Sequence, residues 1–232
     1  MQNWKSVWEA RKMDLSARST LAALMKADGL DTEFGAMPEE PWRQFVADCA
    51  EKLGITSGSS VFEVGCGAGA FLYNLALAGC QVAGADLSAA QIDHIHQAIP
   101  QGTWTVQEAI DIDPEPFDYV IAMGVFMYFP SHDYALEVLQ RMMHKSAKGI
   151  AVLDIPDAAK QTEALRFRQG SIGDEDYRVR YEGLSHLYFD KQWMNDSLAS
   201  LGLRRWEIED QHISGYGNAA YRFNMFAWKD HA

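Results

Sequence analysis

The sequence predicts an α/β fold in which helices cover both faces of a doubly wound, mostly parallel sheet. Short apolar runs rich in β-branched residues alternate with helix-length segments from residue 61 to about residue 155. The first run, Val61–Val64, leads directly into a glycine-rich turn, a helix and a second apolar run. Such alternation is typical of parallel strands joined by helices. The chain has 232 residues, enough for one well-buried domain but few for two, so we expect residues 1–232 to form one domain.

Seven strands are expected, taken in chain order. They are Val61–Val64, Gln81–Ala85, Thr103–Gln107, Phe117–Met123, Gly149–Ile155, Leu203–Glu209 and Tyr221–Lys229. Between them the pattern predicts helices over Phe71–Ala78, Ala90–Ile99, a segment from Ser131 or Asp133 to about His144, and residues 190–201.

Residues 2–53 precede the first strand and are expected to be helical. The segment WKSVWEAR places two indoles and an arginine at helical spacing. Asp14 or Ser16 is expected to cap a second helix that runs to about Ala27, and Pro41 to begin a third.

Residues 156–189 interrupt the alternation of strands and helices. The segment is polar, contains three glycines and carries three tyrosines and two phenylalanines. It is longer than an ordinary connection, and connections of that length in compact domains tend to be functional. We therefore expect a cover over the site, inserted after the fifth strand.

The glycine-rich turn predicts a nucleoside site. Gly65, Gly67 and Gly69 follow the first strand at once, and Asp86 stands at the end of the second strand. Glycine lets a ligand approach the main chain closely, and an acid at that strand end can bind ribose hydroxyls.

Two details argue against a dinucleotide. The fingerprint G-x-G-x-x-G/A is met by Gly65, Gly67 and Ala70, but Gly69 is a third glycine that comes one residue early. Glu63, two residues before the turn, would face a pyrophosphate unfavourably and suits a cofactor that carries an ammonium group and no phosphate.

The stretch E-x-G-x-G-x-G from Glu63 resembles motif I of the class I S-adenosylmethionine (SAM) methyltransferases, and Asp86-Leu87-Ser88 resembles the D-x-S of that family. The resemblance spans residues 58–229 and is sharpest over 61–129. It implies a Rossmann-like seven-stranded sheet with an antiparallel C-terminal hairpin, and SAM as co-substrate. It also implies a small-molecule substrate, a helical lid over residues 1–55 and a cover over residues 156–189.

The resemblance also implies which residues hold SAM. Glu63 and the three glycines would bind the methionine end, Asp86 the ribose, and Glu108-Ala109 the adenine, with Asp111 as a nearby competitor of Glu108. Met123 would border the sulfonium, and Arg11 could reach the SAM carboxylate. The expected SAM-binding residues are Arg11, Glu63, Gly65, Gly67, Gly69, Asp86, Leu87, Glu108, Ala109 and Met123.

Methyl transfer asks for an aligned nucleophile and, for a hydroxyl or a protonated amine, a general base. The expected catalytic residues are Tyr128, His186, Asp154 and Tyr177. Tyr128 follows the fourth strand, where its ring could pack on the sulfonium. The tyrosines of the cover could instead form an aromatic cage for a cation. The seven histidines show no metal-ligand spacing, so no metal is expected.

Composition limits the partners. The chain has 20 basic and 32 acidic residues and a formal net charge of −12, which disfavours nucleic acid and anionic membranes. Its three cysteines lack metal or redox spacing, and no signal peptide or membrane span is evident. A cytoplasmic enzyme is expected; its oligomeric state stays open, with a homodimer as one option.

A SAM cyclase is a second reading of the same fold. The segment WxxxWxxR, the fifth-strand LDIPD and the tyrosine-rich cover together resemble bacterial SAM cyclases, in which the amino group attacks the γ-carbon. The products there are azetidine-2-carboxylate and methylthioadenosine. An NAD(P)-binding oxidoreductase and a non-catalytic SAM-binding protein also stay open.

Overall fold

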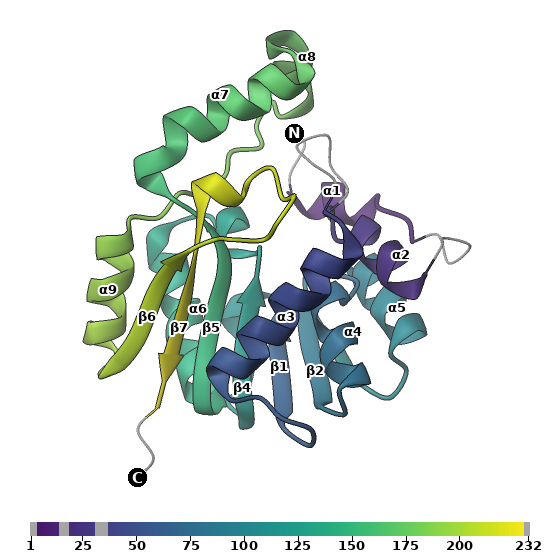
Figure 1. The fold of residues 1–232 in the computed structure, drawn as a ribbon, viewed down its shortest axis with the longest axis vertical. Coiled ribbons are helices and arrows are strands. Elements are labelled where there is room, and N and C mark those ends of the chain that lie inside the picture. Colours follow the sequence, from purple (N-terminus) through teal and green to yellow (C-terminus); the bar gives the residue numbers. More distant parts are fainter. Residues whose placement is uncertain (1–3, 14–18, 31–36, 230–232) are drawn as a thin grey trace.

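A computed structural model describes residues 4–13, 19–30 and 37–229. Its centre is a seven-stranded sheet in the order β3-β2-β1-β4-β5-β7-β6 (Figure 1). The strands are β1 Ser60–Val64, β2 Gln81–Asp86, β3 Thr103–Val106, β4 Phe117–Met123, β5 Ser146–Pro156, β6 Arg205–Asp210 and β7 Arg222–Trp228. The first five pair in parallel, whereas β7 runs antiparallel to both β5 and β6. The predicted fold class is confirmed.

The α-helices connect and cover these strands (Figure 1). They are α1 Trp4–Glu9, α2 Thr20–Ala27, α3 Glu39–Leu53, α4 Ala70–Leu77, α5 Ala89–Ala98, α6 His132–Lys145, α7 Gln161–Ile172, α8 Asp174–Arg180 and α9 Lys191–Ser200. Three of the helices after β1 begin at side-chain caps that the sequence carries: Ser88 Oγ accepts from Gln91 N, Ser131 Oγ from Tyr134 N and Asp190 Oδ1 from Gln192 N. Ser131 rather than Asp133 therefore caps α6.

The helices before β1 match the expectation in number but not in every boundary. The N-cap of α2 is Ser19, whose Oγ accepts from Ala22 N at 3.0 Å. The expected caps, Asp14 or Ser16, lie outside the described residues. Helix α3 begins two residues before Pro41, which stands in the first turn, where a missing N–H costs nothing.

Two apolar cores lie on the two faces of the sheet. Along β1, Val61 joins the cluster formed with α2, α3, α4 and α5, whereas Phe62 joins the cluster formed with α6 and α9. This division follows from the two-residue period of a strand. Each parallel strand at the centre of the sheet is therefore buried on both sides, which explains the continuous apolar runs in the sequence.

The cover after β5 is helical, where the sequence predicted only a polar interruption. Helices α7 and α8 extend beyond the carboxyl ends of the strands (Figure 1). Gly173, with φ of 88°, separates them. In α8, three acids occupy the first turn and two arginines the last, a charge order that favours a short helix.

Candidate active site

The turn between β1 and α4 is held tightly at the carboxyl end of the sheet. Gly65 N donates to Ala85 O at 2.8 Å, which ties the turn to β2. Gly65 has φ of 68°, and a Cβ there would lie 2.4 Å from a methyl carbon of Val125. Any other residue here would have a strained backbone conformation, and its side chain would collide with Val125. Glycine is therefore required at this position.

A cavity of about 790 Å³ opens above this turn. Its size falls in the range of small-molecule sites. It is bordered by the ends of β1, β2, β4 and β5, by α1 and by the cover. The predicted residues that line it are Arg11, Glu63, Gly65, Gly67, Asp86, Leu87, Glu108, Ala109, Met123, Tyr128, Asp154 and His186.

Two predicted residues do not line the cavity. Gly69 is the N-cap of α4, and a Cβ there would lie 2.5 Å from Ile95 Cδ1, so its role is helix packing. Tyr177 packs on Tyr181 with ring centroids 4.8 Å apart, and the Arg168 guanidinium carbon lies 5.4 Å from its ring centre. Tyr177 therefore contacts the cavity only through its neighbours Arg168 and Tyr181, which both line it.

Asp86 is held by the main chain on both oxygens. Oδ1 accepts from Ser88 N at 2.8 Å, and Oδ2 accepts from Gly67 N at 3.0 Å. Burial raises the pKa of this carboxyl, and these hydrogen bonds partly oppose the rise. A carboxylate fixed in this way can accept further hydrogen bonds from a vicinal diol.

Glu63 is a buried acid in the same cavity, with 2% of its surface exposed. Its Oε2 has no hydrogen-bond partner among the described residues. Burial raises its pKa well above the ordinary value, and the nearby acids Asp28 and Asp86 raise it further. A buried polar atom left unpaired costs free energy, so this oxygen points to a missing donor.

Asp28, which the sequence analysis missed, lies on the glycine turn. At the C-cap of α2, its Oδ1 accepts from Ala68 N at 2.5 Å and its Oδ2 from Ala70 N at 2.9 Å. Burial raises its pKa to about 7. The adjacent Gly29, with φ of 75°, follows this C-cap, but no motif marks Asp28 in the sequence.

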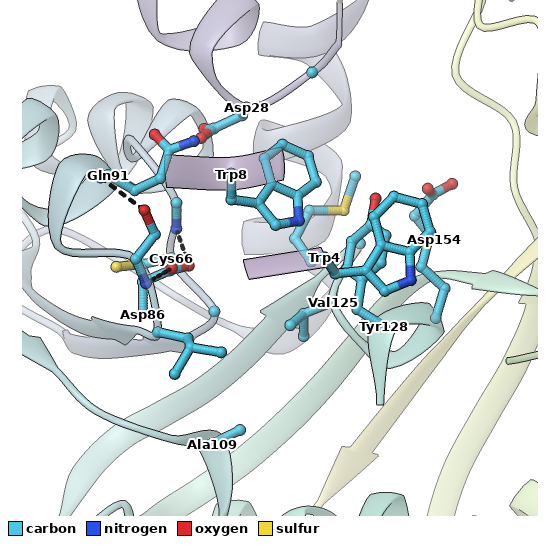
Figure 2. A pocket seen from close by; sticks show the side chains of 18 of the residues that line it. Trp4, Trp8, Asp28, Cys66, Asp86, Gln91, Ala109, Val125, Tyr128 and Asp154 are labelled. Carbon is cyan, nitrogen blue, oxygen red and sulfur yellow. Dashed lines mark hydrogen bonds between the residues drawn. The ribbon is translucent and has the colours of Figure 1, made fainter. Parts of the chain in front are cut away.

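Aromatic side chains of α1 form the opposite wall. The Trp4 ring lies 4.7 Å from that of Tyr128 and 5.0 Å from that of His186, and Trp8 lies 5.4 Å from Tyr128. Figure 2 shows the acids Asp28 and Asp86 on one side of the pocket and Trp4, Tyr128 and Asp154 on the other. The pocket thus has an acidic end and an aromatic end.

Arg11, Glu108 and Met123 also line the cavity. Arg11 Nη1 donates to Lys26 O at 2.8 Å, and its guanidinium carbon lies 5.2 Å from the centre of the Trp8 ring. Glu108 Oε2 accepts from Tyr134 Oη at 3.3 Å. The competitor Asp111 is not among the lining residues, which favours Glu108 as the acid at this place.

Asp154 has the one positive φ, 60°, among non-glycine residues in the part of the chain that the structure describes. Tyr216 Oη donates to its Oδ2 at 2.9 Å, and its Oδ1 is buried without a partner among the described residues. Its main-chain N donates to Asn224 Oδ1 at 2.9 Å, which helps to hold the strained backbone. Such strain, maintained by surrounding hydrogen bonds, is typical of functional positions.

His186 is neutral in this environment. Its Nδ1 lies 2.7 Å from Arg168 Nη1, so Nδ1 accepts that hydrogen bond. Burial lowers its pKa well below the ordinary value, and Arg168 and Arg222 lower it further. Burial also raises the pKa of Tyr128 to about 12, so that phenol stays protonated.

Arg168 and Arg222 also line the cavity and were missed as site residues. Both are buried, and Arg222 Nη1 donates to Asp154 O at 3.4 Å. The signal in the sequence was weak: Arg222 is the single cation within the strand RFNMFAW. A buried cation at the start of an apolar strand is a reason to suspect a site.

The described residues offer neither a metal cluster nor a membrane helix. Within residues 4–13, 19–30 and 37–229, no group of three or more His, Cys, Asp or Glu side chains could hold a metal ion. No helix in the described part of the chain is long and apolar enough to cross a membrane.

Comparisons with known proteins agree with this geometry. A family described as "Methyltransferase domain" matches residues 35–214. A curated relative is the probable non-canonical nonribosomal peptide synthetase CymA of Salinispora arenicola, 30% identical over 127 residues. That match covers 51% of this chain and 2% of CymA, so the chain spans only a small part of that relative's length.

Solved structures share the fold at low identity. One is the magnesium protoporphyrin IX methyltransferase of Synechocystis with bound SAM, at 17% identity and a TM-score of 0.58, covering 82% of this chain and 80% of that one. Another is CalS10, an amino pentose methyltransferase of Micromonospora echinaspora, at 13% identity and a TM-score of 0.59, covering 82% and 92%. At these identities the likeness shows the fold alone.

Proposed function

The chain belongs to the methyltransferase-domain family, and from this premise we propose that it transfers the methyl group of SAM to a small metabolite. The family membership confirms the prediction of a SAM-dependent transferase. The observation that carries the proposal is the acidic end of the cavity. There the glycine turn, the fixed carboxylate of Asp86 and the unpaired oxygen of Glu63 lie together.

The described residues fit SAM group by group. Asp86 would bind the ribose hydroxyls, with Leu87 beside it, and Glu108 and Ala109 would bind the adenine. Glu63 would accept a hydrogen bond from the ammonium group, which supplies the donor that its Oε2 lacks. Arg11 would pair with the carboxylate, and Met123 would border the sulfonium.

A phosphate-bearing dinucleotide fits this turn poorly. The main-chain N–H groups at a helix N-terminus commonly bind phosphate. Here Ala68 N and Ala70 N already donate to the Asp28 carboxylate. A pyrophosphate would have to displace that carboxylate while facing Glu63 and Asp86. An NAD(P)-binding oxidoreductase is therefore disfavoured.

At the aromatic end, Asp154 is better placed to act as a base than His186. SAM supplies an activated methyl group, so the acceptor needs alignment and loss of a proton. Asp154 Oδ1 is available within the cavity wall, while His186 Nδ1 is engaged by Arg168. We assign proton removal to Asp154 and orientation of the acceptor to Tyr128.

The aromatic wall favours a second candidate, the SAM cyclase. Trp4 and Trp8 pack directly against Tyr128 and so occupy much of the end where an acceptor would lie. In that reaction the amino nitrogen of SAM attacks its own γ-carbon, and the electrons of the broken carbon–sulfur bond go to sulfur. The ammonium proton would pass to a carboxylate at the acidic end before the attack.

One incubation tests both candidates. A methyltransferase given SAM alone should leave it intact, and should release S-adenosylhomocysteine only when a metabolite extract is added. A cyclase should release methylthioadenosine from SAM alone. Asp154→Asn should still bind SAM but lose transfer to the acceptor. SAM that remains unchanged in every incubation, as seen by chromatography, would refute both and leave a non-catalytic SAM-binding protein.

For partners and place of action we propose a cytoplasmic enzyme that binds small molecules and no nucleic acid. The net charge of −12 supports this, because it repels phosphate backbones. A filter-binding assay at low salt in which the protein retains DNA or RNA would contradict it.

A further inference from the structure

We propose that Asp28, carried by the N-terminal lid, is a SAM-binding residue that pairs with the ammonium group of the methionine portion. The inference rests on the proposed use of SAM and adds a residue that precedes the matched family domain. It assigns to the lid a direct part in binding the co-substrate, rather than only a covering role.

The side chain of Asp28 is firmly placed at the turn. Its two hydrogen bonds to Ala68 N and Ala70 N hold both oxygens against the start of α4. A Cβ on Gly67 would lie 2.3 Å from Asp28 Oδ1, so the absence of a side chain at Gly67 makes room for this carboxylate. Asp28 and Gly67 both line the cavity.

Three acids therefore meet at one end of the cavity: Asp28, Glu63 and Asp86. They interact electrostatically, since Asp28 and Asp86 each raise the pKa of Glu63. Arg11 opposes the pKa rise of Asp28 only weakly, after burial, two hydrogen bonds and Asp86. Buried like charges of this kind are stabilised by a cation of opposite charge.

The unpaired Oε2 of Glu63 indicates what kind of cation is missing. It is buried, lines the same cavity and lacks a hydrogen-bond partner among the described residues. A sulfonium brings charge but no N–H donor, whereas an ammonium group brings three donors. The described acids do not form a metal site. An ammonium group between Glu63 and Asp28 meets both the charge and the hydrogen-bonding requirement.

The position of Asp28 in the chain gives this contact a second effect. Asp28 follows α2 directly, and α2 contacts both α4 and α5. A ligand that binds Asp28 thus holds the lid against the turn, in addition to filling the cavity.

Calorimetry with two ligands tests the proposal. S-adenosylhomocysteine carries the ammonium group, and methylthioadenosine lacks the whole amino acid portion. Asp28→Asn keeps an oxygen for the turn but removes the charge. It should weaken S-adenosylhomocysteine binding roughly 10- to 100-fold, as expected for a hydrogen bond to a charged group. The affinity for methylthioadenosine should stay within about twofold, the spread expected from a change that leaves its contacts intact.

Two further variants serve as controls. Asp86→Asn should weaken both ligands, because both carry the ribose. Asp93→Asn, on the exposed side of α5, should weaken neither. Methylthioadenosine binding also reports that the Asp28→Asn protein is folded around the cavity.

The outcomes are distinct. An unchanged affinity for S-adenosylhomocysteine in Asp28→Asn would overturn the proposal, and so would an equal loss for both ligands, which would indicate a purely structural role. If the unaltered protein bound neither ligand, the proposed use of SAM itself would fail.

Discussion

At the scale of single residues, the carboxyl group of Asp28 makes the stability of the fold depend on pH. Its pKa rises from 3.8 to about 7 because burial disfavours the charged form. Between these pH values the folded state binds more protons than the unfolded state, so the free energy of unfolding falls as pH rises. Above pH 7 the loss for Asp28 alone is about 4 kcal/mol. Burial also raises the pKa values of Glu63 and Asp86, so these two acids act in the same direction as Asp28.

This predicts an unusual pH dependence for the ligand-free protein. Its melting temperature should be higher at pH 5.5 than at pH 8, by an amount on the order of 10 °C. Asp28→Asn should flatten the slope and melt above the unaltered protein at pH 8, although it binds SAM less well. Thermal melting at several pH values checks this. A higher melting temperature at pH 8 than at pH 5.5 would contradict the assigned burial of these acids.

The same residues show which parts of the site can be predicted from the sequence. Asp86 could be predicted because a strand end after a glycine turn fixes where its side chain points. Asp28 could not, because its position depends on how α2 packs across the turn, and no local spacing encodes that contact. The residue type alone predicts a catalytic role for Tyr177, yet the helical cover directs it onto Arg168 and away from the cavity.

At the scale of elements, Trp42 joins α3 to the start of α4, the helix that follows the glycine turn. Trp42 is 1% exposed, packs against Phe45 and Phe71, and its Nε1 donates to Ala70 O at 3.0 Å. Ala70 begins α4 and also donates to Asp28. One indole thus supports the core and the start of α4 together.

Trp42→Ala should therefore cost about 3–5 kcal/mol of unfolding free energy, as is usual for a buried tryptophan. Trp42→Phe should cost less, since it keeps most of the apolar contact and loses the hydrogen bond to Ala70 O. Urea denaturation gives both values. A loss below about 1 kcal/mol for Trp42→Ala would mean that α3 does not pack on α4 in solution.

The elements differ in how well the sequence predicts them. Strands β1, β4 and β5 are buried on both faces, so their apolar runs are unambiguous. Helices α7 and α8 bury few residues, only Ala164 and Arg168 in α7 and none in α8. Without a regular apolar face they give no helical period, and the cover could be predicted only as a polar interruption.

At the scale of the whole molecule, ligand binding and folding are linked. The cavity is bordered by the lid, the sheet and the cover, so an occupant contacts parts of the chain far apart in sequence. Such a ligand binds the folded state and not the unfolded chain, and it stabilises the fold by about 2.7 kcal/mol at 100 times its dissociation constant.

SAM or S-adenosylhomocysteine at that concentration should raise the melting temperature by roughly 5–10 °C. Asp86→Asn at the same ligand concentration should show little of this shift, whereas Asp93→Asn should show all of it. Differential scanning fluorimetry makes the comparison. A shift of equal size in Asp86→Asn would place the ligand away from this turn.

The meeting of Asp28 with the glycine turn has a consequence for how such a site can diversify. The turn belongs to the matched family segment, residues 35–214, and Asp28 precedes it. Trp4, Trp8 and Arg11 precede it as well, although all of them line the cavity. Substitutions in the preceding segment therefore reshape the cavity without changing the sequence of the turn. A protein can thus keep the same glycine turn and still change the reaction of the bound co-substrate, by substitutions in the residues of the preceding segment that line the cavity.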